Sequence, residues 1–154
     1  MQNADLLQAM VNEPDMLAVL APGYDHVDMS PFWRNPKNVM LGDENGAAIF
    51  AERPDEPGVF EGHYLLRSGR AGNLELARRF IAAMFTEHAA QAIWGNVHTE
   101  NRAARAFSRA LGFAPRGHSL LPSGRPCVIY VLERATWAKL SGESLEGSAA
   151  SVER

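Results

Sequence analysis

Hydrophobic positions change their spacing several times along the chain, and each change predicts a new element. Residues 4–11 (ADLLQAMV) carry a short apolar stripe, and residues 12–20 (NEPDMLAVL) contain a Glu-Pro pair that suits the first turn of a helix. Residues 21–37 are rich in Pro, Gly and Asp, with aromatic side chains between them. This composition predicts a long ordered loop, and such loops in compact domains often carry function.

From residue 38 onwards, short apolar runs predict strands. Residues 38–52 hold two such runs around Asn45-Gly46, which is the strongest local signal for a hairpin. Residues 59–66 (VFEGHYLL) alternate or run apolar as a buried strand does, and residues 91–98 (QAIWGNVH) predict another strand. Residues 114–121 and 125–134 predict a final strand pair, joined by a turn around Pro122-Ser123-Gly124.

Two segments between these strands have helical spacing. Apolar residues recur with the period of a helix in residues 69–88, with Asn73 as the predicted N-cap. Residues 101–113 (NRAARAFSRALGF) place apolar and arginine side chains on different faces, beginning at Asn101 and ending at Gly112 as a left-handed C-cap. The order helix, helix, β, β, β, α, β, α, β, β predicts an α/β or α+β layered fold, with a central mixed sheet flanked by helices.

Length, composition and net charge indicate the size of the domain and the kinds of partner to expect. The chain has 154 residues, 46% hydrophobic and 21% charged, which suits a single globular domain over residues 1–138. Residues 139–154 are mostly small and polar, and they predict a disordered tail. A formal net charge of −3 predicts no bulk attraction to nucleic acid or to an anionic membrane.

The single cysteine and the terminal sequence bear on the compartment. Cys127 has no partner for an internal disulfide, and it lies in an apolar strand pattern that predicts a core position. We find no apolar run near the ~20 residues of a membrane span, and no basic segment of a secretory signal at the N-terminus. A cytoplasmic protein is therefore expected. The five histidines show no metal-ligand spacing, so no metal site is predicted.

The segment LLRSGRAGN (residues 65–73) joins a predicted strand directly to a predicted helix. Backbone N–H groups at the start of a helix favour an anion, and Gly69 and Gly72 allow the backbone to approach a phosphate closely. Arg67 and Arg70 add positive charge. An ordinary tight turn with surface arginines explains the same residues about equally well. The glycines match neither G-x-G-x-x-G nor a P-loop.

The segment 101–113 also carries a family signature. Its pattern resembles N-x-x-A-x-x-x-Y-x-x-x-G-F of the GCN5-related N-acetyltransferases, with matches at Asn101, Ala104, Gly112 and Phe113, whereas Ser108 stands at the tyrosine place. The resemblance covers about residues 39–134. The string GVFEGHYLL ahead of GRAG is further similar to small acetyltransferases encoded by phages and prophages. The resemblance implies that the cosubstrate is acetyl-CoA.

The resemblance also implies which residues hold the cosubstrate. Of the family pattern R/Q-x-x-G-x-G/A, Arg67 and Gly72 keep the first and last places, while Arg70 takes the first glycine place; a shifted register using Gly69-Arg70-Ala71 is the alternative. Asn101 would bind the pantetheine, and Arg105 would reach a phosphate or remain solvated. By analogy, backbone groups would bind the pantetheine arm from Leu65, Leu66 and Arg67, and the pyrophosphate from Arg70, Ala71, Gly72 and Asn73.

Acetyl transfer to an amine needs a base, because an alkyl ammonium group has a pKa of about 10.4. Glu61 and His63 lie two residues apart on one predicted strand and therefore on the same face. Glu61 is the candidate general base, with His63 beside it or in its place. The alternative is a polar pair satisfied by neighbouring loops. Ser108 replaces the tyrosine that, in the family, protonates the departing thiolate, and it is a much weaker acid. Tyr64 and Tyr130 are the other tyrosines considered for that role.

The resemblance implies an N-acetyltransferase that moves acetyl from acetyl-CoA to an amine, and we expect direct attack in a ternary complex. The alternative is a non-catalytic acyl-CoA-binding or protein-interaction domain, and a nucleic-acid module is a third, disfavoured by the net charge. The expected acceptor is an amine-bearing small molecule, peptide or protein. Tyr24, His26 and Trp33 are candidate substrate contacts or loop anchors. The hydrophobic final strands allow pairing across a homodimer.

Overall fold

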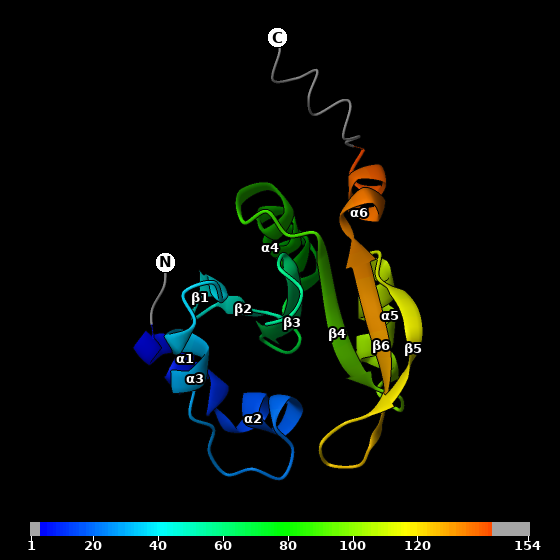
Figure 1. The fold of residues 1–154 in the computed structure, drawn as a ribbon. Coiled ribbons are helices and arrows are strands. Elements are labelled where there is room, and N and C mark those ends of the chain that lie inside the picture. The colour runs from blue at the N-terminus through cyan, green and yellow to red at the C-terminus, as the bar shows by residue number, and fades with distance from the viewer. Residues whose placement is uncertain (1–3, 143–154) are drawn as a thin grey trace.

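A computed structural model describes residues 4–142 of the chain, and Figure 1 shows their arrangement. The elements follow the predicted order, with two further short helices, α3 and α6. In chain order they are α1 (Ala4–Val11), α2 (Pro14–Leu20), α3 (Ser30–Arg34), β1 (Val39–Asp43), β2 (Gly46–Glu52), β3 (Val59–Leu66), α4 (Asn73–Glu87), β4 (Ala92–His98), α5 (Arg102–Ala110), β5 (Ala114–Leu120), β6 (Pro126–Glu133) and α6 (Arg134–Leu140).

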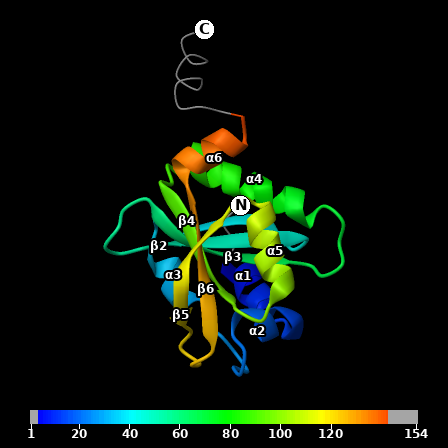
Figure 2. The ribbon, with the colours of Figure 1, turned by 90° about the vertical axis from the view of Figure 1, so that its right-hand side faces the viewer.

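One mixed sheet forms the centre of the structure, which confirms the predicted layered α/β fold. Its strand order is β1-β2-β3-β4-β6-β5, with β3 and β4 parallel and every other neighbouring pair antiparallel. In Figure 2, β2 and β3 run across the view while β4 and β6 run up it. The sheet therefore turns sharply between β3 and β4.

Alternation along the strands gives the sheet two apolar faces, each with its own cluster. On the first face, which we call the α4 side, residues such as Phe60 and Tyr130 pack with α4 and with Leu111 and Phe113 beyond α5. On the second face, the α1 side, Ile49 and Leu65 pack with the buried side chains of α1, α2 and α3. Successive residues of β3 face opposite sides because the side chains of a strand alternate.

The helix signals in the sequence are confirmed at α5 and corrected at α4. The Asn101 side chain caps α5 by accepting a hydrogen bond from the Ala104 N–H at 3.0 Å. Gly112 has a φ of 99°, and Phe113 N–H donates to the Ser108 carbonyl at 3.0 Å, which closes the helix in a Schellman motif. The prediction of Asn73 as the N-cap of α4 is wrong, because left-handed Gly72 occupies that position and α4 begins at Asn73.

The sequence analysis also missed α3 and α6. The α3 helix lies inside the segment predicted as loop, and the side chains of Gln8 and Asn12 bind the backbone of Val27 just before it. The α6 helix directly follows β6, and its Trp137 ring stacks on Phe85 with 5.0 Å between centroids. This helix continues to Leu140, past the predicted domain end at residue 138. Residues 143–154 of the predicted tail lie outside the described residues.

Residues 4–142 show neither a membrane-spanning helix nor a cluster of metal ligands. In this part of the chain we find no helix that combines the length and the apolar character needed to cross a bilayer. The same residues contain no group of three or more His, Cys, Asp or Glu side chains arranged to hold a metal ion. Cys127 is buried and unpaired, at the core position that its strand pattern predicts.

The β1–β2 hairpin provides a test of the fold. Its strands pair from Val39 with Phe50 to Asp43 with Gly46, so its two-residue loop is Glu44-Asn45, one residue before the predicted Asn45-Gly46. Gly42 has a φ of 97°, and a Cβ there would lie 2.2 Å from the backbone oxygen of Gly46.

We predict that Gly42→Ala lowers the free energy of unfolding by about 3 kcal/mol or more, because backbone atoms cannot move away cheaply. Gly124→Ala is the matched control, since its φ is 86° but nothing lies within 4 Å of the added Cβ. That change is expected to cost about 1 kcal/mol. Urea denaturation measures both, and equal losses would contradict the prediction.

Candidate active site

The central feature of the candidate site is an opening between two parallel strands. β3 and β4 pair only through Val59–Glu61 and Ala92–Trp94, yet β3 continues to Leu66 and β4 to His98. Beyond Glu61 the two strands separate, as the differing directions of β3 and β4 in Figures 1 and 2 illustrate. Strand edges without a neighbouring strand offer N–H and C=O groups to an extended ligand.

The 67–73 loop leads from this opening to the start of α4. Gly69 and Gly72 have φ values of 71° and 89°, and nothing lies within 4 Å of a Cβ built on either. The Asn73 side chain donates to the Arg67 carbonyl at 2.7 Å and thereby fixes the path of the loop. The first amides of the 15-residue α4 helix follow at once. A loop of this kind suits a phosphate group.

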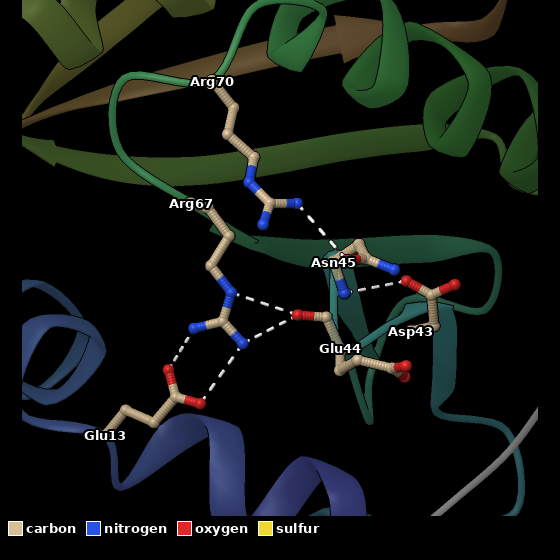
Figure 3. Close-up of polar contacts among 6 residues, drawn as sticks. All are labelled: Glu13, Asp43, Glu44, Asn45, Arg67 and Arg70. Carbon is tan, nitrogen blue, oxygen red and sulfur yellow. Dashed lines mark hydrogen bonds and ion pairs between the residues drawn. The ribbon is translucent and has the colours of Figure 1, made fainter.

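The two arginines of this loop are used differently, as Figure 3 shows. The Arg67 guanidinium forms an ion pair with both carboxylate oxygens of Glu13 and donates to the Glu44 carbonyl at 2.7 and 3.1 Å. Arg67 thus ties the loop to the α1–α2 corner and to the β1–β2 turn. The Arg70 guanidinium makes one long contact, 3.4 Å to Asn45 Oδ1. Arg70 is therefore the better placed of the two to bind an anion.

The other wall of the opening is the junction between β4 and α5. Arg105 donates to the Thr99 carbonyl at 2.9 Å, and so it is anchored rather than fully solvated. His98 Nδ1, Thr99 Oγ1 and Arg105 Nε are buried and have no hydrogen-bond partner among the described residues. Buried polar atoms are nearly always paired, so three unpaired atoms together indicate a place for water or a ligand. Asn101 lies within the same short segment.

Glu61 and His63 are close together on the α1 side, as the sequence predicts. His63 Nε2 lies 3.4 Å from Glu61 Oε2, and both side chains are partly exposed. The hydrogen bond from His63, and to a smaller extent the positive charge of Arg53, lowers the pKa of the Glu61 carboxyl below its usual value although burial opposes this. Glu61 is therefore ionised at neutral pH and able to accept a proton.

A groove of about 520 Å³ begins beside this pair on the α1 side. Trp94, the strand partner of Glu61, lines it, and the Arg53 guanidinium lies 5.2 Å from the centre of the indole ring. The sequence analysis predicted the strand that carries Trp94 but did not consider Arg53. Side chains two apart on a strand share a face, so Trp94 lies on the same face of β4 as the polar Asn96. This alternation was the sequence signal that Trp94 could lie at a surface groove. The groove is lined by Arg53, Glu56, Val59, Gln91, Ala92, Trp94, Asn96, Ser119, Ile129, Val131 and Glu133.

The predicted substrate residues of the N-terminal segment are not among those that line this groove. Tyr24 is 66% exposed, and His26 Nε2 contacts the Gln8 side chain at 3.3 Å. Trp33 belongs to α3, where it packs edge-on against Phe32 and joins the α1-side cluster. The packing of Trp33 is that of a loop anchor, whereas Tyr24 is exposed, and the role of these residues toward a substrate stays a prediction.

Ser108 stays in the α5 helix as the signature predicts, but its hydroxyl is engaged. Ser108 Oγ donates to the Ala104 carbonyl one turn earlier at 3.0 Å. A serine that bonds back to its own helix has no second proton to give. The structure therefore offers no free donor at the tyrosine place of the signature.

Comparison with known proteins relates this geometry to a fold. No family model and no curated protein matches the chain. Solved structures do match. An aminoglycoside acetyltransferase, AAC(6')-Ib, in complex with coenzyme A and kanamycin has a TM-score of 0.66 and 18% identity over 90% of this chain and 93% of that one. The spermidine N-acetyltransferase from Vibrio cholerae, in complex with CoA and spermine, has a TM-score of 0.72 and 14% identity over 89% and 94%.

The fold is that of the GCN5-related N-acetyltransferases. A structure of the same Vibrio cholerae enzyme described as dodecameric matches with a TM-score of 0.61 and 16% identity over 73% of this chain and 74% of that one. At this level of identity the likeness extends to the fold, and it confirms the architecture that the sequence predicts.

The Glu61–His63 contact predicts a pH effect. A lowered folded-state pKa stabilises the protein above the carboxyl's unfolded-state pKa, and this contribution disappears as the pH falls through the folded value. We expect His63→Ala to raise the pKa of Glu61 and to remove that contribution, so the two proteins differ in stability at neutral pH and converge in acid. Carboxyl NMR titration measures the pKa. His26→Ala is the control, and an unchanged Glu61 titration in His63→Ala would refute the contact.

The Arg67–Glu13 pair predicts a coupling between loop and helices. In a double-mutant cycle, Arg67→Met and Glu13→Gln are expected to couple by about 1 kcal/mol in the free energy of unfolding, the upper range for a partly exposed pair. Arg70→Met is the matched control and should cost about 0.3 kcal/mol or less, because its contact is long and exposed. Additive effects of the first two changes would show that the pair contributes nothing.

Proposed function

We propose that this protein is an N-acetyltransferase that moves the acetyl group of acetyl-CoA to an amine acceptor by direct attack in a ternary complex. The observation that carries the proposal is the separation of β3 from β4 after Glu61, with a glycine-bearing helix start at one end and a carboxylate–imidazole pair at the other. The matching acetyltransferase structures, which contain CoA, support it.

In this proposal the cosubstrate lies along the opening. Its pyrophosphate takes the backbone amides of residues 70–73, where two left-handed glycines leave room for it, and the Arg70 side chain adds charge. The pantetheine arm pairs with the free edge of β3 at Leu65, Leu66 and Arg67. From the other wall, the Asn101 amide nitrogen donates to the arm while its oxygen continues to cap α5. Arg105 holds this junction in place through Thr99.

The acceptor reaches the thioester from the α1 side. Glu61, which is ionised at neutral pH, accepts the proton of the amine directly or through a water molecule. The amine nitrogen then forms a bond to the acetyl carbon, the C–S bond breaks, and its electron pair remains on the CoA sulfur. The acceptor amine itself lies in the groove, where Trp94, Ile129 and Val131 offer apolar contact. Glu56 and Glu133 also line the groove, each paired with an arginine, Arg53 at 3.5 Å and Arg116 at 2.5 Å.

A second function, acyl-CoA binding without turnover, is favoured by one observation. The Ser108 hydroxyl is bonded to Ala104 and does not provide the acid of the family signature. The two functions differ in a direct assay, because only an enzyme releases CoA when an amine is added to bound acetyl-CoA. Spermine and kanamycin are the first amines to test, since matching structures contain them.

Self-association remains part of the proposal. One matching spermidine N-acetyltransferase structure is dodecameric, and in this chain β5 forms an edge of the sheet with mostly exposed side chains. An edge strand can pair with a second copy. Sedimentation measurements distinguish the expected homodimer from a monomer.

Titration calorimetry with CoA and acetyl-CoA tests the cosubstrate site. We expect Asn101→Ala to weaken binding by about 1–2 kcal/mol and also to lose the helix cap. Asn101→Asp is the matched control for folding, because a carboxylate still caps α5 but has no N–H to donate. Both variants should bind CoA weakly, and only the alanine variant should be less stable. Wild-type affinity in Asn101→Asp would limit Asn101 to capping, and no binding by the wild type would refute the proposed function.

A further inference from the structure

Two buried tyrosine hydroxyls on the α4 side of the sheet have no partner. Tyr130 is 1% exposed, and neither Tyr64 Oη nor Tyr130 Oη has a hydrogen-bond partner among the described residues. A buried hydroxyl without a partner costs free energy, so its retention needs a reason. The third tyrosine of the chain, Tyr24, is exposed and lies in the N-terminal segment.

Tyr64 lies at the point where β3 and β4 separate. Its hydroxyl reaches back over Gly62, where an added Cβ would lie 3.2 Å from it. Gly62 is the first residue of β3 after the last parallel pair, Glu61 with Trp94. Gly95 of β4 is the facing residue, since a Cβ on it would lie 3.5 Å from the Gly62 oxygen. The place of a Gly62 side chain is filled by the Phe50 ring and the Tyr64 hydroxyl, whereas among the described residues the Gly62 oxygen is the one atom within 4 Å of a Cβ on Gly95. The open space at the apex of the opening therefore lies over Gly95, next to the hydroxyl.

Tyr130 is also near the apex of the opening, but it lies on a strand that does not border the opening. It belongs to β6 and pairs with Gly95, so the whole width of β4 separates its backbone from the opening. Tyr64 belongs to a strand that borders the opening directly. Of the two unpartnered hydroxyls, that of Tyr64 is the one adjacent to a ligand held between β3 and β4.

We propose that the Tyr64 hydroxyl donates a hydrogen bond to the sulfur atom of bound acetyl-CoA and stabilises the thiolate that leaves. This inference rests on the proposed function. It assigns a catalytic role to a strand residue in place of Ser108, whose own proton is engaged by Ala104. Tyr64 acts from the α4 side, while Glu61 and His63 accept the amine proton from the α1 side.

The chemistry of Tyr64 is that of a hydrogen-bond donor and not of a proton source. Burial raises the pKa of its phenol far above the usual value, so the hydroxyl keeps its proton. When the C–S bond breaks, the electron pair remains on sulfur, and a hydrogen bond to that anion is stronger than one to the neutral thioester. Such a bond stabilises the transition state more than the ground state. The thiolate is protonated by water after CoA leaves.

The test compares Tyr64→Phe with Tyr130→Phe. For Tyr64→Phe we expect kcat with an accepted amine to fall about 10- to 100-fold, with the KM for acetyl-CoA nearly unchanged. The ultraviolet absorbance of the thiolate reports the pKa of the thiol of bound CoA without any acceptor, and this pKa should rise in Tyr64→Phe. Tyr130→Phe should leave both quantities near the wild-type values.

Thermal stability separates catalysis from structure. Tyr64→Phe removes a buried hydroxyl that has no partner, so its melting temperature should equal or exceed that of the wild type. A lower melting temperature accompanied by lost activity would overturn the inference in favour of a structural role. Unchanged kcat and unchanged thiol pKa in Tyr64→Phe would overturn it while leaving the acetyltransferase proposal intact. If the wild type does not bind CoA, the acetyltransferase proposal itself is refuted, and the role of Tyr64 with it.

Discussion

The arrangement of the candidate site depends on how briefly β3 and β4 pair. Three residue pairs join the two strands, from Val59–Ala92 to Glu61–Trp94, and then the ladder stops. On either side the pairing is long, seven residue pairs between β2 and β3 and seven between β4 and β6. Each half of the sheet is therefore well bonded within itself, and the weak seam lies between them. The unpaired strand edges and the space over Gly95 both follow from this seam.

The parts around the seam are held by contacts between residues far apart in the chain. Arg67 joins the 67–73 loop to Glu13 and to the Glu44 carbonyl, which bridges the α1–α2 corner, the hairpin turn and the start of α4. At the opposite end, Arg134 donates to the carbonyls of Phe85 and Ala90, at 2.7 and 3.0 Å, and closes the turn between α4 and β4. The seam is flanked by fixed points on both sides, which suits a site that must hold its shape before a ligand binds.

Features that depend on residues close together in the chain were predicted correctly. Contacts between residues far apart in the chain were not predicted. The hairpin at residues 39–52 and the capped α5 helix follow from turn and cap chemistry within a few residues, and both are confirmed. The Glu61–His63 contact follows from strand alternation alone. The Arg67–Glu13 pair joins residues 54 apart, and no local pattern indicates it. The short α6 helix was missed because it follows β6 without a break, and its stability comes from packing on α4.

The predicted substrate residues are not among those that line the groove. The composition of the Pro-rich segment pointed to Tyr24, His26 and Trp33, which stay a prediction, whereas the groove is lined mainly by strand residues, Trp94 among them. Which face of β4 is covered depends on helices that come before it in the chain, and the sequence of β4 alone does not reveal it. The expected likeness to phage-encoded enzymes stays a prediction.

The three tryptophans are distributed so that each lies in a different part of the molecule. Trp33 packs in the α1-side cluster, Trp94 lines the groove under Arg53, and Trp137 stacks on Phe85 where α6 meets α4. Indole fluorescence responds to its immediate surroundings. Variants that keep one indole at a time would therefore give three separate optical reports, on the N-terminal helices, on the groove and on the C-terminal closure, from a single small chain.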